Sequence, residues 1–332
     1  MHLLDRLPLA VELAASRSRM FTPRKMLNRM TRRFDMLKSR SRDLPERQRT
    51  LYATLQWSWE LLTPQEQAAL SQCSVFRGGF TLDAAEAVLA LDDTEWVDDV
   101  LGQLIDKSMI RSHEQGDTRE IRLSLLMSVQ QFASQQLANA EAVERRHGQA
   151  LVQFAEDAAS PKQLQTEFDN LLIACQRAAQ RDDVDTLSRL IKPVGNVFFS
   201  AGPFREGGRF LDTLWEQLPS RLANSLDLNI LIAAGRLWLQ AGEFETCQAR
   251  LNDVQRYARE HGFSDATLRA TALQAEWHYR SGSYDDAIRL SQDTIQLAQE
   301  QNNHTYQWKT HSNLGMMFTH QGRLEESEHH LR

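Results

Sequence analysis

The sequence predicts a mainly α-helical protein in which a small module of helices and one hairpin precedes a long array of helical hairpins. Three observations predict this fold class. Helix-start signals recur along the chain, two alternating apolar runs lie together in residues 108–126, and glycines recur every 40 residues between Gly202 and Gly322. With 332 residues, of which 42% are hydrophobic, the chain has room for two or three domains with buried cores.

Charge and composition argue against several classes of protein. A net charge of −6 disfavours a protein that coats nucleic acid or lies on anionic lipid. No segment approaches the roughly 18 apolar residues of a membrane span, so we expect no membrane association. The three cysteines are far apart and odd in number, which fits a reducing compartment better than a disulfide framework. We therefore expect a cytoplasmic protein.

The first expected domain, residues 1–50, is helical and basic. Residues 17–49 carry 12 lysines and arginines against three acids. Such a density of cations is compatible with contact to nucleic acid or with a solvated helical face that meets a neighbouring part of the molecule. We favour the second interpretation.

Residues 51–137 form the second expected domain. The tetrapeptide Thr63-Pro64-Gln65-Glu66 is a capping box, and short helices are expected at roughly 64–76, 81–90 and 95–107. A β-hairpin is expected over residues 108–126, with its turn at Gly116-Asp117. Three short helices followed by a two-stranded ribbon are the layout of a winged helix. A connecting helix is expected over residues 138–164.

The charge of the helix before the hairpin disfavours DNA binding by this module. A winged helix often inserts a helix into the major groove. Here that helix carries four acids against Lys107, namely Glu95, Asp98, Asp99 and Asp106. A phosphate backbone would repel these carboxylates, so we expect a structural winged helix and keep DNA recognition as the alternative.

Residues 165–332 form the last expected domain, a repeat array. Gly202, Gly242, Gly282 and Gly322 are separated by 40 residues each. Small residues stand seven positions before and five positions after most of these glycines, and a ring stands four positions before each. The earlier small residues are Gly195, Gly235, Ala275 and Gly315, and the rings are Phe198, Trp238, His278 and Phe318. This pattern predicts helical hairpins that stack into an α-solenoid.

One face of the first helix of each hairpin carries the candidate binding residues. Positions 13, 10, 6 and 3 before each turn glycine lie on the same side of a helix. They are rich in cations although the chain is acidic, which favours a groove for an acidic peptide, a protein partner or an anionic small effector. A solvated face without a ligand is the alternative. The candidate residues are Arg189, Lys192, Asn196, Asn229, Arg236, Arg269, Tyr279 and Lys309.

The repeat columns resemble the tetratricopeptide pattern, with a longer unit that is similar to the repeats of the bacterial maltose-regulon activator family. The front of the chain agrees with this resemblance. LPLAVELAASRSR, residues 7–19, resembles the proline motif of STAND-class (AP-type, NB-ARC-like) signalling ATPases, in which the proline packs near the adenine. The resemblance implies this role for Pro8. Residues 42–88 are similar to the linker and winged helix of that family.

Two departures from the family pattern affect the expected activity. Arg6 replaces the usual glycine, and no G-x-x-x-x-G-K-S/T motif occurs in the sequence. Without that loop no backbone amides or lysine are placed to hold nucleotide phosphates. We therefore expect no cofactor, with ATP or ADP bound only in a relative that has the P-loop core. We also expect this chain to be the C-terminal part of such a protein, with an incomplete last repeat.

The sequence thus predicts the non-catalytic sensing and coupling half of a STAND-type regulator. A transcription regulator that binds DNA through its winged helix is the chief alternative, and an ATPase is a third that needs an added nucleotide core. Motifs for hydrolases and metal sites are absent from the sequence, so no catalytic or metal-binding residue is assigned.

Overall fold

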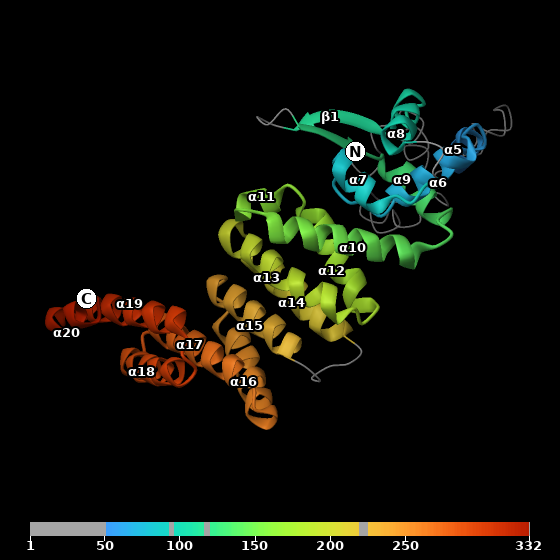
Figure 1. Cartoon of the computed structure of the whole chain (residues 1–332). Coiled ribbons are helices and arrows are strands. Elements are labelled where there is room, and N and C mark those ends of the chain that lie inside the picture. Colours follow the sequence, from blue (N-terminus) through green and yellow to red (C-terminus); the bar gives the residue numbers. More distant parts are fainter. Residues whose placement is uncertain (1–50, 93–95, 116–119, 219–224, 332) are drawn as a thin grey trace, which may run out of the picture. The chain divides into compact units, whose positions relative to one another are not determined.

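The computed structural model describes residues 51–92, 96–115, 120–218 and 225–331. Within these ranges it contains sixteen helices and one two-stranded sheet, which confirms the mainly α fold class (Figure 1). The chain divides into two compact units, residues 1–151 and 152–332, and the division falls inside one helix, α10 (Ala140–Asp157). The interpretation of residues 1–50, including Arg6 and Pro8, lies outside the described residues.

The first unit has the expected order of three short helices and a hairpin. Its elements are α5 (Leu51–Glu60), α6 (Pro64–Cys73), α7 (Leu82–Val88), α8 (Val97–Asp106), β1 (Arg111–Gln115), β2 (Glu120–Ser124) and α9 (Met127–Gln135). The strands are antiparallel, with Arg111 opposite Ser124 and Gln115 opposite Glu120. The capping box at Thr63 and Glu66 is confirmed, because each side chain accepts a hydrogen bond from the backbone N–H of the other residue.

An isolated β-bridge between Phe80 and Leu123 extends the hairpin, which the sequence did not predict. Phe80 exchanges two backbone hydrogen bonds of 2.8 Å with Leu123. Gly79 makes this approach possible, because its φ is +97° and a Cβ there would lie 2.8 Å from the carbonyl oxygen of Leu123. Residues 76–80 therefore form a turn at whose end Phe80 pairs with Leu123 of β2. The ring of Phe80 is fully buried and stacks on Phe76 at 4.3 Å.

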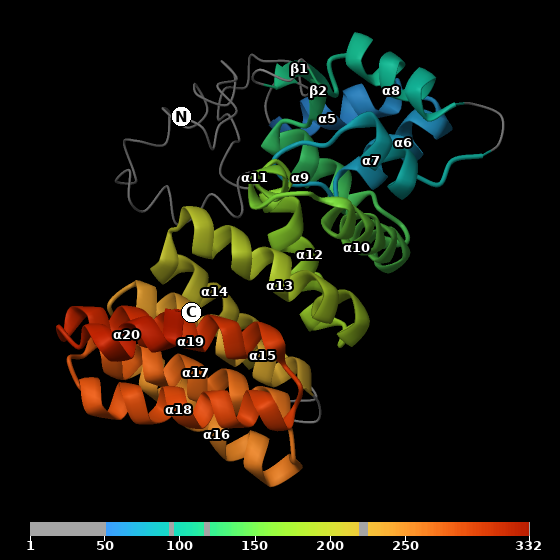
Figure 2. The ribbon, with the colours of Figure 1, turned by 60° about the vertical axis from the view of Figure 1, so that its left-hand side comes forward.

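The second unit consists of antiparallel helices stacked in chain order (Figure 2). Its elements are α11 (Pro161–Gln165), α12 (Phe168–Gln180), α13 (Val184–Ala201), α14 (Phe204–Gln217), α15 (Ser225–Gln240), α16 (Phe244–His261), α17 (Ser264–Arg280), α18 (Tyr284–Glu300), α19 (His304–His320) and α20 (Leu324–Leu331). The hairpins α13–α14, α15–α16, α17–α18 and α19–α20 are the predicted repeats.

The periodic glycines lie in the turns between paired helices. Their φ angles are +68° at Gly202, +76° at Gly242, +86° at Gly282 and +74° at Gly322. L-residues with a side chain rarely adopt this conformation, so the 40-residue glycine period has a backbone cause.

The small-residue and ring columns also have the predicted packing roles. A Cβ at Gly207 would lie 2.6 Å from the ring of Phe198, and one at Gly315 would lie 2.5 Å from Leu331. The rings of Phe198, Trp238 and Phe318 are buried, whereas His278 is half-buried. Cys247, the small residue five positions after Gly242, is fully buried. These contacts confirm that small residues let neighbouring helices approach while rings fill the space between hairpins.

Candidate functional site

Two adjoining cavities follow the first helices of the repeats in the second unit. The larger cavity, of about 450 Å³, is lined from α13, α15 and α17 and by Tyr306 of α19. The smaller, of about 60 Å³, is lined mainly from α15, α17 and α19. Ile232, Arg236, Arg269 and Tyr306 line both. We call this continuous feature the cationic groove.

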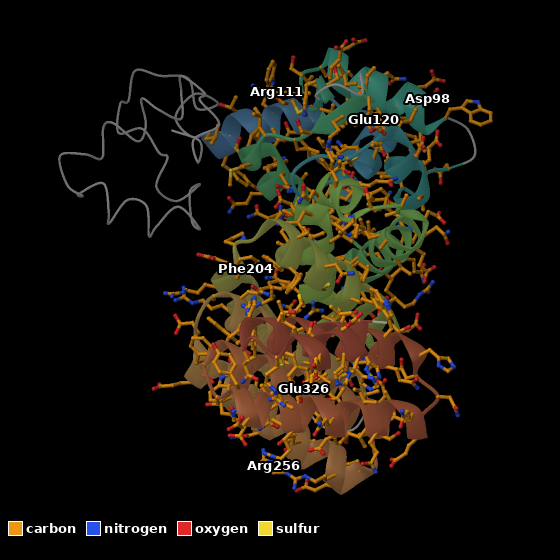
Figure 3. The ribbon with its side chains drawn as sticks, turned by 90° about the vertical axis from the view of Figure 1, so that its left-hand side faces the viewer. Asp98, Arg111, Glu120, Phe204, Arg256 and Glu326 are labelled. Carbon is orange, nitrogen blue, oxygen red and sulfur yellow. The ribbon has the colours of Figure 1, made fainter. Side chains whose placement is uncertain are left out.

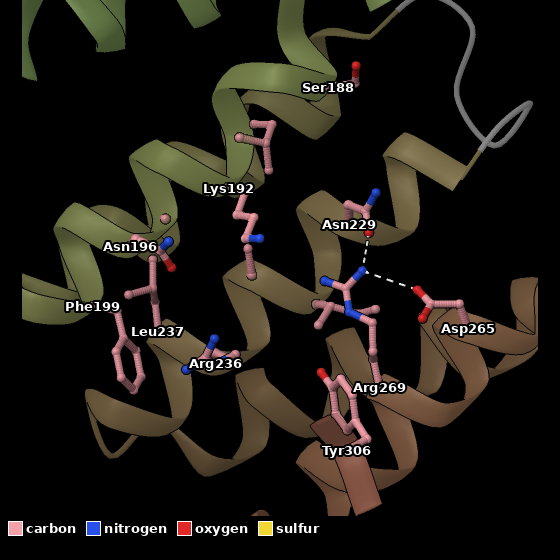
Figure 4. A pocket seen from close by; sticks show the side chains of 14 residues that line it. Ser188, Lys192, Asn196, Phe199, Asn229, Arg236, Leu237, Asp265, Arg269 and Tyr306 are labelled. Atoms are coloured by element: carbon pink, nitrogen blue, oxygen red, sulfur yellow. Dashed lines mark hydrogen bonds and ion pairs between the residues drawn. The ribbon is translucent and has the colours of Figure 1, made fainter. Parts of the chain in front are cut away.

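Helical spacing brings most of the candidate residues to the cationic groove. Lys192, Asn196 and Phe199 project from α13, and Asn229 and Arg236 project from α15 (Figure 4). Lys192, Arg236 and Arg269 point toward the same space in this view. Lys309 lines the smaller cavity. Six of the eight candidate residues therefore lie on one continuous surface.

Two candidate residues, Arg189 and Tyr279, lie outside the cationic groove, contrary to the prediction from helical spacing. Arg189 forms a two-pronged pair with Glu156, at 2.8 Å from Nε and 2.7 Å from a terminal nitrogen. The Glu156 carboxylate, which belongs to α10, therefore neutralises the charge of Arg189. Tyr279 hydrogen-bonds through its hydroxyl to His320 and packs its ring against Tyr284. Neither side chain lines the cationic groove.

Tyr306 and Asp265 line the cationic groove and are not among the residues predicted for it. Tyr306 lies 16 positions before Gly322, about one helical turn before the first predicted groove position of its helix. Asp265 lies 17 positions before Gly282 and ion-pairs with Arg269 at 3.5 Å. Extending the helical spacing by one turn toward each helix N-terminus would have found both residues.

The cations of the cationic groove differ in how they are compensated. Arg269 is held by Asp265 and by a hydrogen bond to the side-chain oxygen of Asn229. Glu276 forms an ion pair with Arg280 at 2.8 Å. Lys192, Arg236 and Lys309 have no ion-pair partner among the residues that the structure describes. The groove thus carries an excess of positive charge on a chain whose net charge is −6.

Aromatic rings border these cations. The guanidinium carbon of Arg236 lies 4.2 Å from the centre of the Phe199 ring, a cation–π arrangement that orients the side chain without neutralising it. Burial lowers the pKa of the Lys309 ammonium, and the positive charge of Arg236 lowers it further while Glu276 acts in the opposite direction. A bound anion would relieve this repulsion between Arg236 and Lys309.

The first unit offers a second candidate surface, the helix α8 that precedes the hairpin. Asp98, Asp99 and Asp106 are exposed on this helix, and Asp98 lies on its outer side (Figure 3). Lys107, which caps the helix, places its Nζ 2.6 Å from the buried carboxylate of Glu66. Glu95 lies outside the described residues. The exposed face of α8 is therefore acidic, as the sequence indicated.

Comparison with known families identifies the first unit. A family model described as a winged helix-turn-helix domain matches residues 62–138. This chain contains a winged helix-turn-helix domain. The matched residues begin just after α5, include α6, α7, α8, the hairpin and α9, and end just before α10.

Mycobacterial proteins are similar to parts of the chain. A Mycobacterium tuberculosis protein with the provisional name of HTH-type transcriptional regulator is 31% identical over an alignment of 227 residues that covers 64% of this chain and 25% of the relative. An uncharacterized protein of the same organism is 36% identical over an alignment of 156 residues that covers 45% of this chain and 39% of the relative. The chain thus spans between a quarter and two fifths of the length of these relatives.

A solved structure also aligns with the chain. It is a signal transduction ATPase with numerous domains (STAND) that has a tetratricopeptide repeat sensor, from Pyrococcus horikoshii. The alignment has a TM-score of 0.42 and 14% identity, and it covers 97% of this chain and 52% of that structure.

The described residues contain few other groups suited to chemistry. They include no cluster of three or more His, Cys, Asp or Glu side chains arranged around a metal position. In the same residues, none of the helices combines the length and apolarity that a bilayer crossing requires. Burial raises the pKa of the Cys175 and Cys247 thiols to about 12 and raises that of Cys73 as well, so these thiols stay protonated and weakly nucleophilic.

Proposed function

We propose that this chain is the sensing and coupling part of a STAND-type signal-transduction regulator, without catalytic activity of its own. In this proposal the cationic groove binds an anionic ligand, which is an acidic peptide, the acidic segment of a protein partner or an anionic small effector. The observation that carries the proposal is that Lys192 lines the larger cavity, Lys309 the smaller and Arg236 both, and that none of the three has an ion-pair partner within the described residues. We propose a cytoplasmic location.

Physical reasons support an anion as the ligand. Planar guanidinium groups match carboxylates and phosphates with two parallel hydrogen bonds, and Arg236 and Arg269 both line the larger cavity. The amides of Asn196 and Asn229 add neutral donors beside them. A pocket of about 450 Å³ has the size of a small-molecule or peptide-end site. Partial enclosure strengthens each charge–charge contact relative to water.

The winged helix-turn-helix domain has a coupling role in this proposal. DNA recognition through α8 is the second candidate function, and the domain match and the names of the mycobacterial relatives favour it. The exposed Asp98, Asp99 and Asp106 argue against it, because they would face phosphates. Gel-shift titration with duplex DNA at low and high salt separates the two functions. Affinity that falls steeply with salt would favour DNA recognition.

A defined anionic probe tests the cationic groove. We expect a fluorescent five-residue acidic peptide with a free carboxyl terminus to bind, as measured by anisotropy. Lys192→Gln with Arg236→Gln removes two charge-assisted contacts of about 1.5–3 kcal/mol each, so affinity should fall about a hundredfold or more. Both residues have exposed or half-exposed side chains, so the fold should persist by circular dichroism.

The matched control is Arg189→Gln with Arg256→Gln, which removes two cations outside the cationic groove. This control should leave peptide affinity unchanged within about twofold, because screened charges at a distance contribute little. A basic peptide of the same length should not bind. Equal losses in the two double variants would mean that binding follows net charge alone, and the groove assignment would be wrong.

A further inference from the structure

Two histidines face each other across the last helix pair of the second unit. His311 of α19 and His330 of α20 place their Nδ1 atoms 2.8 Å apart, with ring centroids 5.1 Å apart. The ring of His330 also stacks on Phe318 at 5.5 Å, with an interplanar angle of 14°. Both histidines are half-buried. The stack fixes the plane in which His330 presents its nitrogen to His311.

The position of α20 against α19 is set by further contacts. The hydroxyl of Ser327 donates to the carbonyl oxygen of Gly315 at 2.8 Å and lies 2.7 Å from the hydroxyl of Thr319. Leu331 packs onto Gly315 so closely that a Cβ at this glycine would overlap it. The two imidazoles are therefore brought together by the packing of the helices rather than by their own hydrogen bond alone.

The chemistry of this pair suits a metal ion. A hydrogen bond between two Nδ1 atoms requires that one nitrogen carry a proton and the other present a lone pair. When the donor ring carries its proton on Nε2 instead, both Nδ1 atoms present a lone pair and can ligate a metal ion as neutral imidazoles, which are preferred ligands of Zn²⁺, Ni²⁺ and Cu²⁺. With metal–nitrogen distances near 2.0–2.1 Å and tetrahedral angles, the two nitrogens would stand about 3.3 Å apart. The observed 2.8 Å needs an opening of only about half an ångström.

We propose that His311 and His330 bind one divalent transition-metal ion of the imidazole-preferring class through their Nδ1 atoms, with water completing the coordination. The proposed site has two protein ligands, since the described part of the chain places no third His, Cys, Asp or Glu with them in a metal-binding cluster. Such a site binds more weakly than a closed four-ligand site. Its effect is to clamp α20 onto α19, at the end of the array remote from the larger cavity's α13 wall.

Zinc and nickel titration of the full chain, with any affinity tag removed, tests the site. Calorimetry should give one Zn²⁺ or Ni²⁺ per chain and no binding of Mg²⁺, which prefers oxygen ligands. His311→Ala and His330→Gln should each weaken Zn²⁺ binding by more than about tenfold, a loss at least as large as that from removing a supporting residue around a metal. His330→Gln keeps a side chain that can hydrogen-bond to His311. A loss of Zn²⁺ affinity in this variant therefore reflects the loss of a metal ligand and not the loss of the contact between the two helices.

The controls use histidines of the same helix. His320→Ala removes the partner of Tyr279, and His304→Ala removes an exposed ring at the start of α19. Both should keep the wild-type Zn²⁺ affinity. Hydrogen exchange of α20 amides should slow with Zn²⁺ in the wild type and in both controls, and should not respond in His330→Gln. Unchanged Zn²⁺ affinity in His330→Gln, or an equal loss in His320→Ala, would overturn the proposal.

Discussion

Replacing Lys107 with methionine removes the cation that pairs with the buried carboxylate of Glu66. Glu66 has no exposed surface, and the Nζ of Lys107 lies 2.6 Å and 2.7 Å from its two oxygens. In the variant the carboxylate keeps the hydrogen bond from the backbone N–H of Thr63, at 2.7 Å, but loses its counter-charge. Methionine keeps an apolar stem of similar length, so the change isolates the charge.

The expected cost follows from this geometry. Removing one partner of a buried ion pair costs about 3–5 kcal/mol. The Lys107 side chain keeps 41% of its surface exposed, so water can reach the vacated position and the lower end, about 3 kcal/mol, applies. For a unit of about 150 residues, 1 kcal/mol shifts the melting temperature by about 2–4 °C. Calorimetry should therefore record a decrease of about 6–12 °C in the transition of the first unit.

Two further variants make this prediction refutable. Arg145→Met breaks an exposed pair with Glu141, whose side chains are 49% and 64% exposed, and should cost at most about 0.5 kcal/mol. Lys107→Met combined with Glu66→Gln removes the buried charge together with its partner and should recover most of the loss. If Lys107→Met costs no more than Arg145→Met, the buried pair does not stabilise the unit.

The same pair gives a pH dependence with a defined sign. Burial raises the pKa of Glu66, but the hydrogen bonds from Lys107 and from the Thr63 N–H outweigh burial and leave the pKa below its ordinary value of 4.5. Because the folded-state pKa is the lower one, the stabilisation is present above pH 4.5 and is lost as pH falls through the folded-state pKa. Wild type should therefore lose more stability on acidification below this pH than Glu66→Gln, as measured by urea unfolding.

Three other outcomes are expected. The purified chain should neither bind ATP with micromolar affinity nor hydrolyse it, because its sequence has no P-loop, and calorimetry with a phosphate-release assay checks this. Trp238→Ala should cost about 3–5 kcal/mol in urea unfolding, since this ring is buried and bonds to Asp212, whereas the exposed Trp308 should tolerate alanine. Hydrogen-exchange protection should decrease from α15 to α20, where Leu324 and Leu331 are exposed; uniform protection would contradict this.

Features with a local cause could be predicted from the sequence. Glycine recurs every 40 residues because each turn between paired helices needs a residue with positive φ. This need concerns one residue at a time, so the sequence shows it directly. Helical spacing alone placed Lys192, Arg236 and Lys309 on one face. The winged helix-turn-helix layout was also readable, since short helices and a hairpin each have their own start and turn signals.

Features that depend on partners far along the chain could not be predicted. Arg189 meets Glu156 33 residues away, and Lys107 meets Glu66 41 residues away. The strand position at Phe80 needs Leu123 opposite it, and nothing in its own neighbourhood encodes that pairing. Charge counted along one helix therefore overestimates the free charge of a groove, because it omits the carboxylates that neighbouring helices supply.

Arg236 is shared by the two cavities of the cationic groove, and this has a consequence for thermodynamic linkage. Its guanidinium is a single donor group that borders both volumes. An anion that draws it into the larger cavity withdraws it from the smaller one, which removes one cause of the lowered Lys309 pKa but leaves burial, the larger cause, in place. Two separate anions would thus compete for one group and bind with negative cooperativity, and by reciprocity each would weaken the other by the same factor. A single elongated anion that spans both cavities would not lose affinity in this way, because it would not compete with a second anion for Arg236.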